Sequence, residues 1–453
     1  MLDNKNKLSE ARRMKKRNRL MARRIFLQRV TAITSWAAMG LLLKSCESAT
    51  TMQPTTGRPP SPGGQNGVPG ASTPPSASAT PVVDPAWAKV LQEAEDHRRS
   101  PFRGITEAGK VEEGLYSIRS TGVSTQPVQL AAQRFLDSLD AGQKKLTQFD
   151  IQSVRWRQWS NTHRYPRVGV SFGQLSDHQR QLAFGVLRAS LSARGLEQSE
   201  NIIKLNGHLG ELTGKPEEFS SGLYWLSIFS NPSNTQPWGW QLDGHHLNIN
   251  YFVLQDQVVI TPLFMGSEPV NARYGPLKGI KLFNEEENLA YELMSSLSPE
   301  QRKKAILADK IPNNVFTAGF RDNYELRYEG IPYSQMTSRQ QEKLLELIGT
   351  YTGRQRKGHA EVWLNEVERH KERLFFAWMG GTGPKDVFYY RIHSPVLLIE
   401  FDHQPALFLD KGKIGRDHIH SVVRTPNGND YGKDLLRQHY LEHDHGDGKP
   451  HSH

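Results

Sequence analysis

The fold is indicated most clearly by the stretch Trp238-Gly239-Trp240-Gln241-Leu242-Asp243-Gly244-His245-His246-Leu247-Asn248-Ile249-Asn250-Tyr251. Asp-Gly is a preferred centre for a two-residue hairpin turn, because both central residues take a positive φ. The stretch therefore predicts two antiparallel strands joined at Asp243-Gly244. In that register Leu242 lies opposite His245, Gln241 opposite His246 and Trp240 opposite Leu247.

Alternation along the strands sorts these side chains onto two faces. The apolar face is expected to be core, and its members are Trp238, Trp240, Leu242, His245, Leu247, Ile249 and Tyr251. The other face carries Gly239, Gln241, His246, Asn248 and Asn250. Amides beside an imidazole suggest a pocket that binds a polar substrate through Gln241, Asn248 and Asn250. A plain exposed face and a buried amide network are the alternatives.

A second group of strands is predicted over residues 386–424. Pro395 separates Phe388–Ser394 from the strongly apolar run Val396–His403, so Glu400 within that run should be buried. A buried carboxylate must be paired, protonated or bound to a metal. Arg391 and Arg424 are its candidate partners, and together with His393 they are also candidate substrate-binding residues.

His418-Ile419-His420 places two imidazoles on one face of a strand, about 7 Å apart along it. Two such groups can bind one ion if a neighbouring strand supplies a third ligand. His246, His403 and His393 are the available third members, of which we favour His246 and His403. A pair of surface or hydrogen-bonding histidines is the alternative.

The loop 425–432 follows at once and is rich in Pro, Gly and Asn. Asn429 or Asp430 could cap the helix expected to begin near Tyr431. Asp430 could instead serve as a carboxylate ligand or as a base.

Four segments share one type of helix start, in which a capping residue precedes Gln by three positions. The pairs are Asp140 and Gln143, Ser176 and Gln179, Ser298 and Gln301, and Thr337 and Gln340. Apolar periodicity predicts helices at about 176–194, 298–308, 337–352 and 359–379. The starts do not recur at a fixed period, which argues against a solenoid. Helices packed with antiparallel strands at 236–263 and 386–424 predict a single large α+β domain.

The N-terminal segment predicts where the protein works. Residues 1–45 contain Arg23-Arg24 and then an apolar stretch that is too short for a bilayer span, and the only cysteine, Cys46, follows. This pattern predicts a twin-arginine lipoprotein-type signal, lipidation at Cys46 and an extracytoplasmic, membrane-anchored protein. Residues 46–84 should form a flexible Pro/Ser/Gly-rich linker, and 85–440 the globular domain.

The tail 441–453 is predicted to be disordered and to carry the histidines His443, His445, His451 and His453.

Charge argues against a nucleic-acid partner. Residues 1–45 hold 12 Lys and Arg against 2 Asp and Glu, so their net charge equals the +10 of the whole chain and the remainder is formally neutral. Nucleic-acid binding needs a clustered positive field, which a neutral domain does not suggest. With Cys46 lipidated, no thiol remains for a disulfide or a thiolate metal site.

Gly169-Val170-Ser171-Phe172-Gly173 matches the nucleophile-elbow pattern of serine hydrolases. An elbow requires a preceding apolar strand and a helix directly after the serine, and neither is indicated here. A serine hydrolase using Ser171 is therefore a minor alternative.

Six stretches, taken together, resemble a bacterial family known as domain of unknown function 3500. The stretches are Pro101–Ile105, Ser117–Ser124, Pro237–His246, Phe264–Pro269, Tyr390–Pro395 and His418–Tyr440. The resemblance covers roughly residues 86–440. It implies one folded unit, often exported, and it brings no assigned activity or catalytic residue.

The first functional hypothesis is an exported metal-dependent hydrolase. His418 and His420 would bind a divalent ion together with His246 or His403, with zinc first and copper or iron possible. An activated water would attack a polar small-molecule substrate, with Glu400 or Asp430 as base. The second hypothesis is a non-catalytic lipoprotein that binds a small polar ligand or sugar.

Overall fold

A computed structural model describes residues 85–442 of the chain. The predicted signal, Cys46, the linker and the tail from residue 443 onward lie outside the described residues. The described residues belong to one compact unit, which contains every element described below. None of the helices within 85–442 combines the length and the apolar character needed to cross a membrane.

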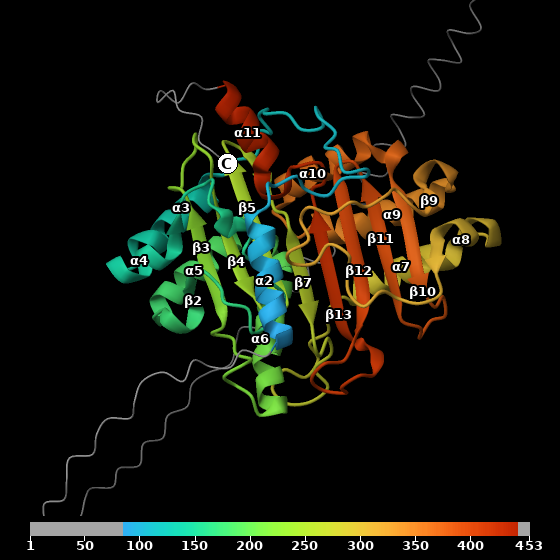
Figure 1. The fold of residues 1–453 in the computed structure, drawn as a ribbon, viewed down its shortest axis with the longest axis horizontal. Helices are drawn as coiled ribbons and strands as arrows, with labels where there is room; N and C mark the ends of the chain where they lie inside the picture. Colours follow the sequence, from blue (N-terminus) through green and yellow to red (C-terminus); the bar gives the residue numbers. More distant parts are fainter. Residues whose placement is uncertain (1–84, 443–453) are drawn as a thin grey trace, which may run out of the picture. The chain divides into compact units, whose positions relative to one another are not determined.

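The unit is organised on one mixed sheet of 13 strands (Figure 1). Ten strands follow one another in space in the order β1 (Gln148–Phe149), β3 (Tyr224–Phe229), β4 (Trp238–Gly244), β5 (Leu247–Leu254), β7 (Leu263–Ser267), β13 (Ile414–Arg424), β12 (Leu397–Pro405), β11 (Phe388–Ser394), β10 (Phe375–Gly380) and β8 (Ile306–Ala308). Three short strands lie off this path, namely β2 (Val170–Ser171), β6 (Gln257–Val259) and β9 (Ile331–Pro332). The pairs β1–β3 and β8–β10 are parallel and the remaining pairs are antiparallel.

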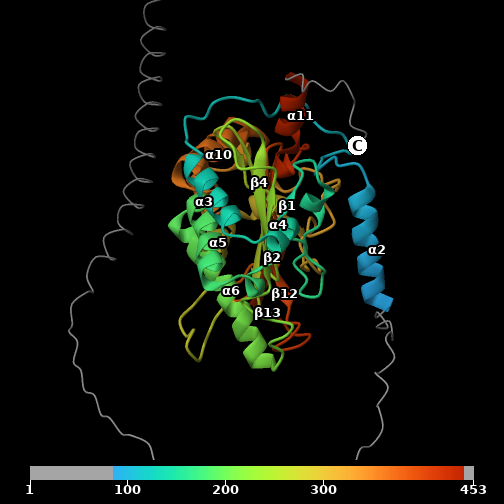
Figure 2. The same ribbon diagram turned by 90° about the vertical axis from the view of Figure 1, so that its left-hand side faces the viewer.

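The two faces of the sheet are covered differently. Helices pack on the apolar face and enclose the main core with it, whereas loops and α2 (Pro85–Arg99) lie over the other face (Figure 2). The helices of the apolar side are α3 (Gln126–Asp137), α5 (Asp177–Ser190), α6 (Ala193–Thr213), α7 (Asn284–Ser296), α9 (Ser338–Thr352) and α10 (Lys357–Arg369). Short helices α4 (Ala141–Thr147) and α8 (Pro299–Ala305), together with α11 (Lys433–Glu442), complete the set. The α+β prediction is confirmed.

The first hairpin forms, but its turn lies two residues later than predicted. Gly244 pairs with Leu247, so His245 and His246 are the turn residues, and His246 takes φ 63°. Gly244 serves a different purpose, because a Cβ there would lie 2.2 Å from the Tyr224 ring on the neighbouring strand. A shift of two residues preserves alternation, so the predicted division into faces is correct.

The described unit contains the same arrangement twice. Apart from the short strand β6 and the 3-10 helices, the order α3-α4-β1-β2-α5-α6-β3-β4-β5-β7 is repeated as α7-α8-β8-β9-α9-α10-β10-β11-β12-β13. The two copies meet where β7 pairs with β13, and the strand order is mirrored on either side of that pair. The four similar helix starts in the sequence are therefore two pairs, one pair in each half.

Each half joins its two capping glutamines by reciprocal amide hydrogen bonds. Gln143 and Gln179 exchange bonds of 3.3 and 2.8 Å, and Gln179 Nε2 also donates to the Ser138 carbonyl. Gln301 and Gln340 exchange bonds of 3.0 and 2.9 Å. These pairs fix one helix start against the other.

The helix predicted at 359–379 is wrong in its second half. Helix α10 ends at Arg369, and Phe375–Gly380 is strand β10, which pairs with β11 and with the short strands β8 and β9. Phe375, Phe376 and Trp378 favour a strand, and pairing with β11 overrides the apparent helical spacing. The helix predicted at 176–194 is also too long at its C-terminal end. Helix α5 ends at Ser190, and Ser192 caps a separate helix, α6.

Replacing Gln340 with alanine should destabilise the domain by about 2 kcal/mol or more, because the backbone groups of Thr337 and Ser296 lose their partner. Gln179→Ala should have a similar cost, because it makes equivalent bonds. Urea unfolding of both variants tests this, with the exposed Gln92→Ala as control. Costs of less than 0.5 kcal/mol, the rough level of a neutral surface change, would contradict it.

Candidate metal centre

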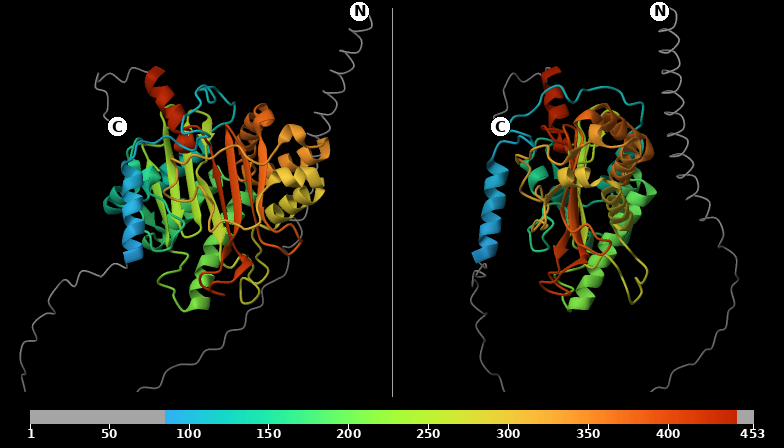
Figure 3. Two further views of the ribbon diagram at one scale, coloured as in Figure 1. Left: turned by 45° about the vertical axis from the view of Figure 1, so that its right-hand side comes forward. Right: turned by 90° about the vertical axis from the view of Figure 1, so that its right-hand side faces the viewer.

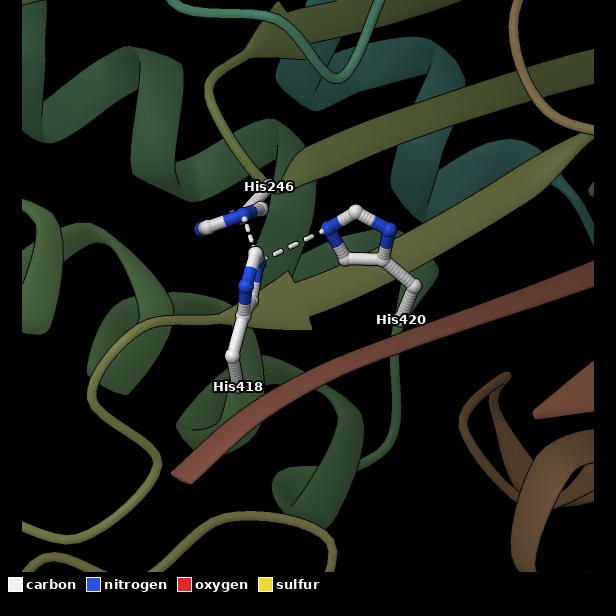
Figure 4. Close-up of side chains that lie close together, drawn as sticks. All are labelled: His246, His418 and His420. Carbon is white, nitrogen blue, oxygen red and sulfur yellow. Dashed lines mark hydrogen bonds between the residues drawn. The ribbon is translucent and has the colours of Figure 1, made fainter. Parts of the chain in front are cut away.

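Three histidines bring their Nε2 atoms together at one end of the central strands (Figure 4). His246 comes from the β4–β5 turn, and His418 and His420 come from β13. His418 Nε2 lies 3.2 Å from His246 Nε2 and 3.1 Å from His420 Nε2. The three ligand atoms all lie within 4.8 Å of one another, and each side chain is nearly fully buried.

Gly266 makes this approach possible. It lies on β7 directly opposite His420, and its N–H donates to the His246 carbonyl on the other side. A Cβ at Gly266 would lie 2.9 Å from His420 Cδ2 and 3.3 Å from His246 Cδ2. Because glycine has no side chain, the rings of His246 and His420 can approach each other over this position.

In His418 and His420, the hydrogen bond made by Nδ1 determines that the lone pair lies on Nε2. His418 Nδ1 donates to the Pro405 carbonyl at 2.8 Å, and His420 Nδ1 donates to Asn314 Oδ1 at 3.0 Å. The Val315 N–H also donates to Asn314 Oδ1, which fixes the amide oxygen as the acceptor. The Nε2 atoms of neutral His418 and His420 therefore both carry lone pairs.

These facing lone pairs need a positive partner. Burial lowers the pKa of His246 and of His420 well below the usual 6.5. Burial also lowers the pKa of His418, although the Glu268 carboxylate acts in the opposite direction. Burial thus disfavours a positive charge on the rings themselves, and the group could instead hold a metal ion. Tetrahedral zinc with imidazole ligands places nitrogens about 3.3 Å apart, close to the separations of 3.2 and 3.1 Å in the structure.

Glu268 forms an outer contact of this site. Its carboxylate lies 3.5 Å from His418 Nδ1 and accepts hydrogen bonds from the backbone N–H groups of Leu407, Phe408 and Leu409. Carboxylates and carbonyls in such positions orient a histidine ligand and increase its basicity. The histidine group could therefore hold a metal ion.

Comparison with known proteins agrees with this architecture. A family model described as "Protein of unknown function (DUF3500)" matches residues 121–433. The chain belongs to the DUF3500 family. The match includes all three histidines and every strand of the sheet. No curated protein and no solved structure matches the chain.

His403, the alternative third ligand, does not join the group in this DUF3500 domain. It pairs with Ile419 on β13, so its side chain projects from the opposite face to His420. Its Nε2 lies 2.8 Å from Glu287 Oε1, and its Nδ1 lies 3.0 Å from the Phe388 carbonyl. Its burial is explained by these structural contacts.

Glu400 is buried as predicted, but its partners differ from the expected arginines. Its carboxylate accepts from the N–H groups of Phe316 and Thr317, from the Thr317 hydroxyl and from the Tyr389 hydroxyl. Arg391 pairs instead with Glu329 at 2.7 Å. Glu400 therefore anchors a covering loop to the sheet.

Asp430 lies at a different place from the histidines. It accepts from Arg424 at 3.1 Å and from the Thr425 N–H at 2.8 Å. Arg424 is four residues beyond His420 on β13, about 13 Å along the strand. Asp430 is thus not placed as a base beside the histidine group, and the Glu400 carboxylate is already bonded to Phe316, Thr317 and Tyr389.

Two amide residues of the first hairpin, Gln241 and Asn250, form a buried network, whereas the Asn248 side chain donates to the Gly244 carbonyl. Gln241 Nε2 donates to Asn250 Oδ1 and to the Trp156 carbonyl, and Asn250 Nδ2 donates to the Pro262 carbonyl. Gln241, Asn248 and Asn250 are at most 1% exposed. This arrangement matches the buried-network alternative, and the face is not open to a ligand in this conformation.

Ser171 lacks the surroundings of a nucleophile. Its hydroxyl donates to Gln174 Oε1, and α5 begins only at Asp177. The strand that contains it, β2, spans two residues. The pattern is therefore a local turn.

Sequence reasoning missed four residues of this region, namely Gly266, Glu268, Asn314 and Asp402. Asp402 lies on β12 directly opposite His420, and its buried Oδ1 has no hydrogen-bond partner among the described residues. Burial raises the pKa of Asp402 well above 3.8. Gly266 and Glu268 fall within the quoted stretch Phe264–Pro269, where a glycine in a strand and a nearby carboxylate were available signals.

Gly266→Ala should disrupt the histidine group, because the added methyl meets His420 Cδ2 and the Ile419 carbonyl. We expect a loss of stability of about 1–3 kcal/mol and at least a tenfold weaker zinc affinity. Thermal denaturation with and without zinc tests this. Gly415→Ala is the matched control, since its Cβ would meet no atom within 4 Å. Unchanged zinc stabilisation in Gly266→Ala would refute the geometric role.

Acid should destabilise the domain partly through His393. Burial, followed by the charge of Arg391, lowers the pKa of His393 to about 3 from 6.5. Between these values the unfolded chain binds a proton that the folded domain does not, so stability falls as pH decreases below about 6.5. His393→Gln should reduce the slope by up to about 1.4 kcal/mol per pH unit. Urea unfolding at several pH values tests this against the exposed control His178→Gln, and equal slopes would contradict it.

Proposed function

We propose that the protein is a metal-dependent enzyme whose histidines His246, His418 and His420 bind one divalent ion. The supporting observation is the 3.1 Å separation between two buried Nε2 atoms whose lone pairs face each other. Without a cation this contact is repulsive, and a proton there is disfavoured by burial.

Zinc is the first candidate metal. An all-imidazole set of three ligands is typical of zinc sites that keep a further position open. Copper and iron also accept imidazole ligands, so redox chemistry is the alternative within the same site.

Hydrolysis of a polar small molecule is the proposed reaction. A bound divalent ion would supply a Lewis acid there. Asp402 replaces Glu400 and Asp430 as the candidate acid–base group, because it lies opposite His420 and its Oδ1 is unpartnered. Pro405 and Glu268 would hold His418 in its orientation.

The geometry gives less support to the alternatives. A non-catalytic binder was expected to use the amide face, and those amides are buried, with Gln241 bonded to Asn250. A serine hydrolase would need a base at Ser171, whose hydroxyl is bonded to Gln174.

We further propose that the domain works outside the cytoplasm. The twin-arginine pattern and Cys46 support export by the twin-arginine route and attachment to the membrane through a lipid. The formally neutral composition of the remaining chain supports a small-molecule substrate over nucleic acid.

Metal content tests the first part of the proposal. The chain over residues 47–442 retains the described domain and lacks the tail histidines, which could bind metal on their own. After dialysis, elemental analysis should find about one metal ion per chain. His418→Gln/His420→Gln should lose it while remaining folded by circular dichroism, and His178→Gln/His370→Gln should retain it.

Activity tests the second part. Hydrolysis of p-nitrophenyl esters and phosphates should be abolished by a chelator, restored by zinc and reduced at least about 100-fold in Asp402→Asn, which should still bind metal. Metal retained in the double histidine variant would refute the site. A loaded protein with no activity on the panel would refute hydrolysis and leave the site standing.

A further inference from the structure

Three segments come together at the end of the sheet beside the histidine group (Figure 3). They are the C-terminal end of α6, the segment 268–283 after β7 and the segment 405–417 that leads into β13. Val270 N–H donates to the Asp417 carbonyl, and Arg273 pairs with Asp417. A Cβ at Gly275 would lie 3.7 Å from His208 of α6. These contacts make the three segments one surface, here named the distal surface.

The distal surface exposes large apolar side chains. It carries five of the nine strongly exposed large hydrophobic residues within the described part of the chain. They are Leu212 at 53%, Tyr274 at 79%, Leu407 at 53%, Leu409 at 38% and Ile414 at 57% exposure. Single exposed apolar residues need no explanation, but several gathered at one end indicate an interaction site.

Positive charge accompanies these side chains. In the segments 268–283 and 405–417 the exposed basic residues are Arg273, Lys278, Lys281, Lys411 and Lys413, against one exposed acid, Asp410. Of the two further acids in these segments, Glu268 is buried and faces His418, and Asp417, whose side chain is 40% exposed, pairs with Arg273. The C-terminal end of α6 adds the exposed Glu211. The exposed charge of the two segments is therefore predominantly positive.

We propose that the distal surface docks onto an anionic membrane. Exposed apolar side chains near lysines suit an anionic membrane. The apolar side chains can insert into the hydrocarbon, and the lysines can bind the negatively charged headgroups. A protein partner would more often be met by a continuous apolar core with a polar rim. Here the apolar groups stand on three separate segments, two of which also carry exposed basic residues.

Docking would bring the segment 405–409, which contacts Glu268 and His418, to the lipid surface. Glu268 binds the backbone of Leu407, Phe408 and Leu409, and the Pro405 carbonyl holds His418. This contact with lipid is made by the folded domain and is separate from a lipid on Cys46.

The test uses the chain from residue 47 onward, which keeps the described residues 85–442 and lacks both the basic leader and Cys46. Flotation with vesicles of equal phosphatidylcholine and phosphatidylglycerol should show binding that falls at least fivefold with pure phosphatidylcholine or in 0.5 M salt, a concentration that screens surface charge within roughly 4–5 Å. Tyr274→Ser/Leu407→Ser/Ile414→Ser and, separately, Lys278→Gln/Lys411→Gln/Lys413→Gln should each weaken binding about tenfold. The matched control Leu130→Ser/Leu146→Ser changes exposed leucines elsewhere and should bind normally.

Three results would overturn the proposal. The first is no binding of the unmodified chain to anionic vesicles, and the second is equal binding by the apolar variant. The third is loss of self-association in the apolar variant, measured by size-exclusion chromatography, without a change in vesicle binding, which would assign the surface to a second copy of the chain. Thermal unfolding confirms that each variant is folded.

Discussion

The close approach of buried imidazoles above Gly266 is the constraint on which the centre of this structure depends. His246 and His420 lie on either side of that glycine, one strand away in each direction, and any side chain at Gly266 would keep them apart. Pro405 and Asn314 hold two of the rings with their lone pairs inward. Burying unpaired lone pairs against each other costs free energy, and a cation held by the three rings would remove that cost.

The repeated architecture explains where this chemistry lies. The two halves share strand order and capping glutamine pairs, but equivalent positions carry different residues. His245 and His246 form the turn of the first half, where Pro395 and Val396 form that of the second. Three pairs before each turn, Gln241 faces Asn250 in one half and Arg391 faces Glu400 in the other. The scaffold is common to both halves, and the histidine group belongs to one end only.

Local patterns predicted the parts of the fold that depend on neighbours in sequence. Alternation gave the hairpin faces, capping residues gave the helix starts, and His418-Ile419-His420 with His246 gave the candidate site. The turn was misplaced because Gly244 is required by Tyr224, on another strand. The strand Phe375–Gly380 was taken for helix because its pairing with β11 is not visible locally. Glu268 and Asn314 act through contacts that only the tertiary structure supplies.

A metal ion at this site would also act on folding. His246 belongs to the first half and His418 and His420 to the last strand of the second, so one ion would bridge the two copies beside the β7–β13 pair. The unfolded chain has no preformed site, and binding energy therefore adds to the stability of the assembled sheet. On this argument the pairing of β7 with β13 positions the ligands, and the ion in turn stabilises that pairing. Catalysis and the joining of the two halves would then depend on the same three side chains.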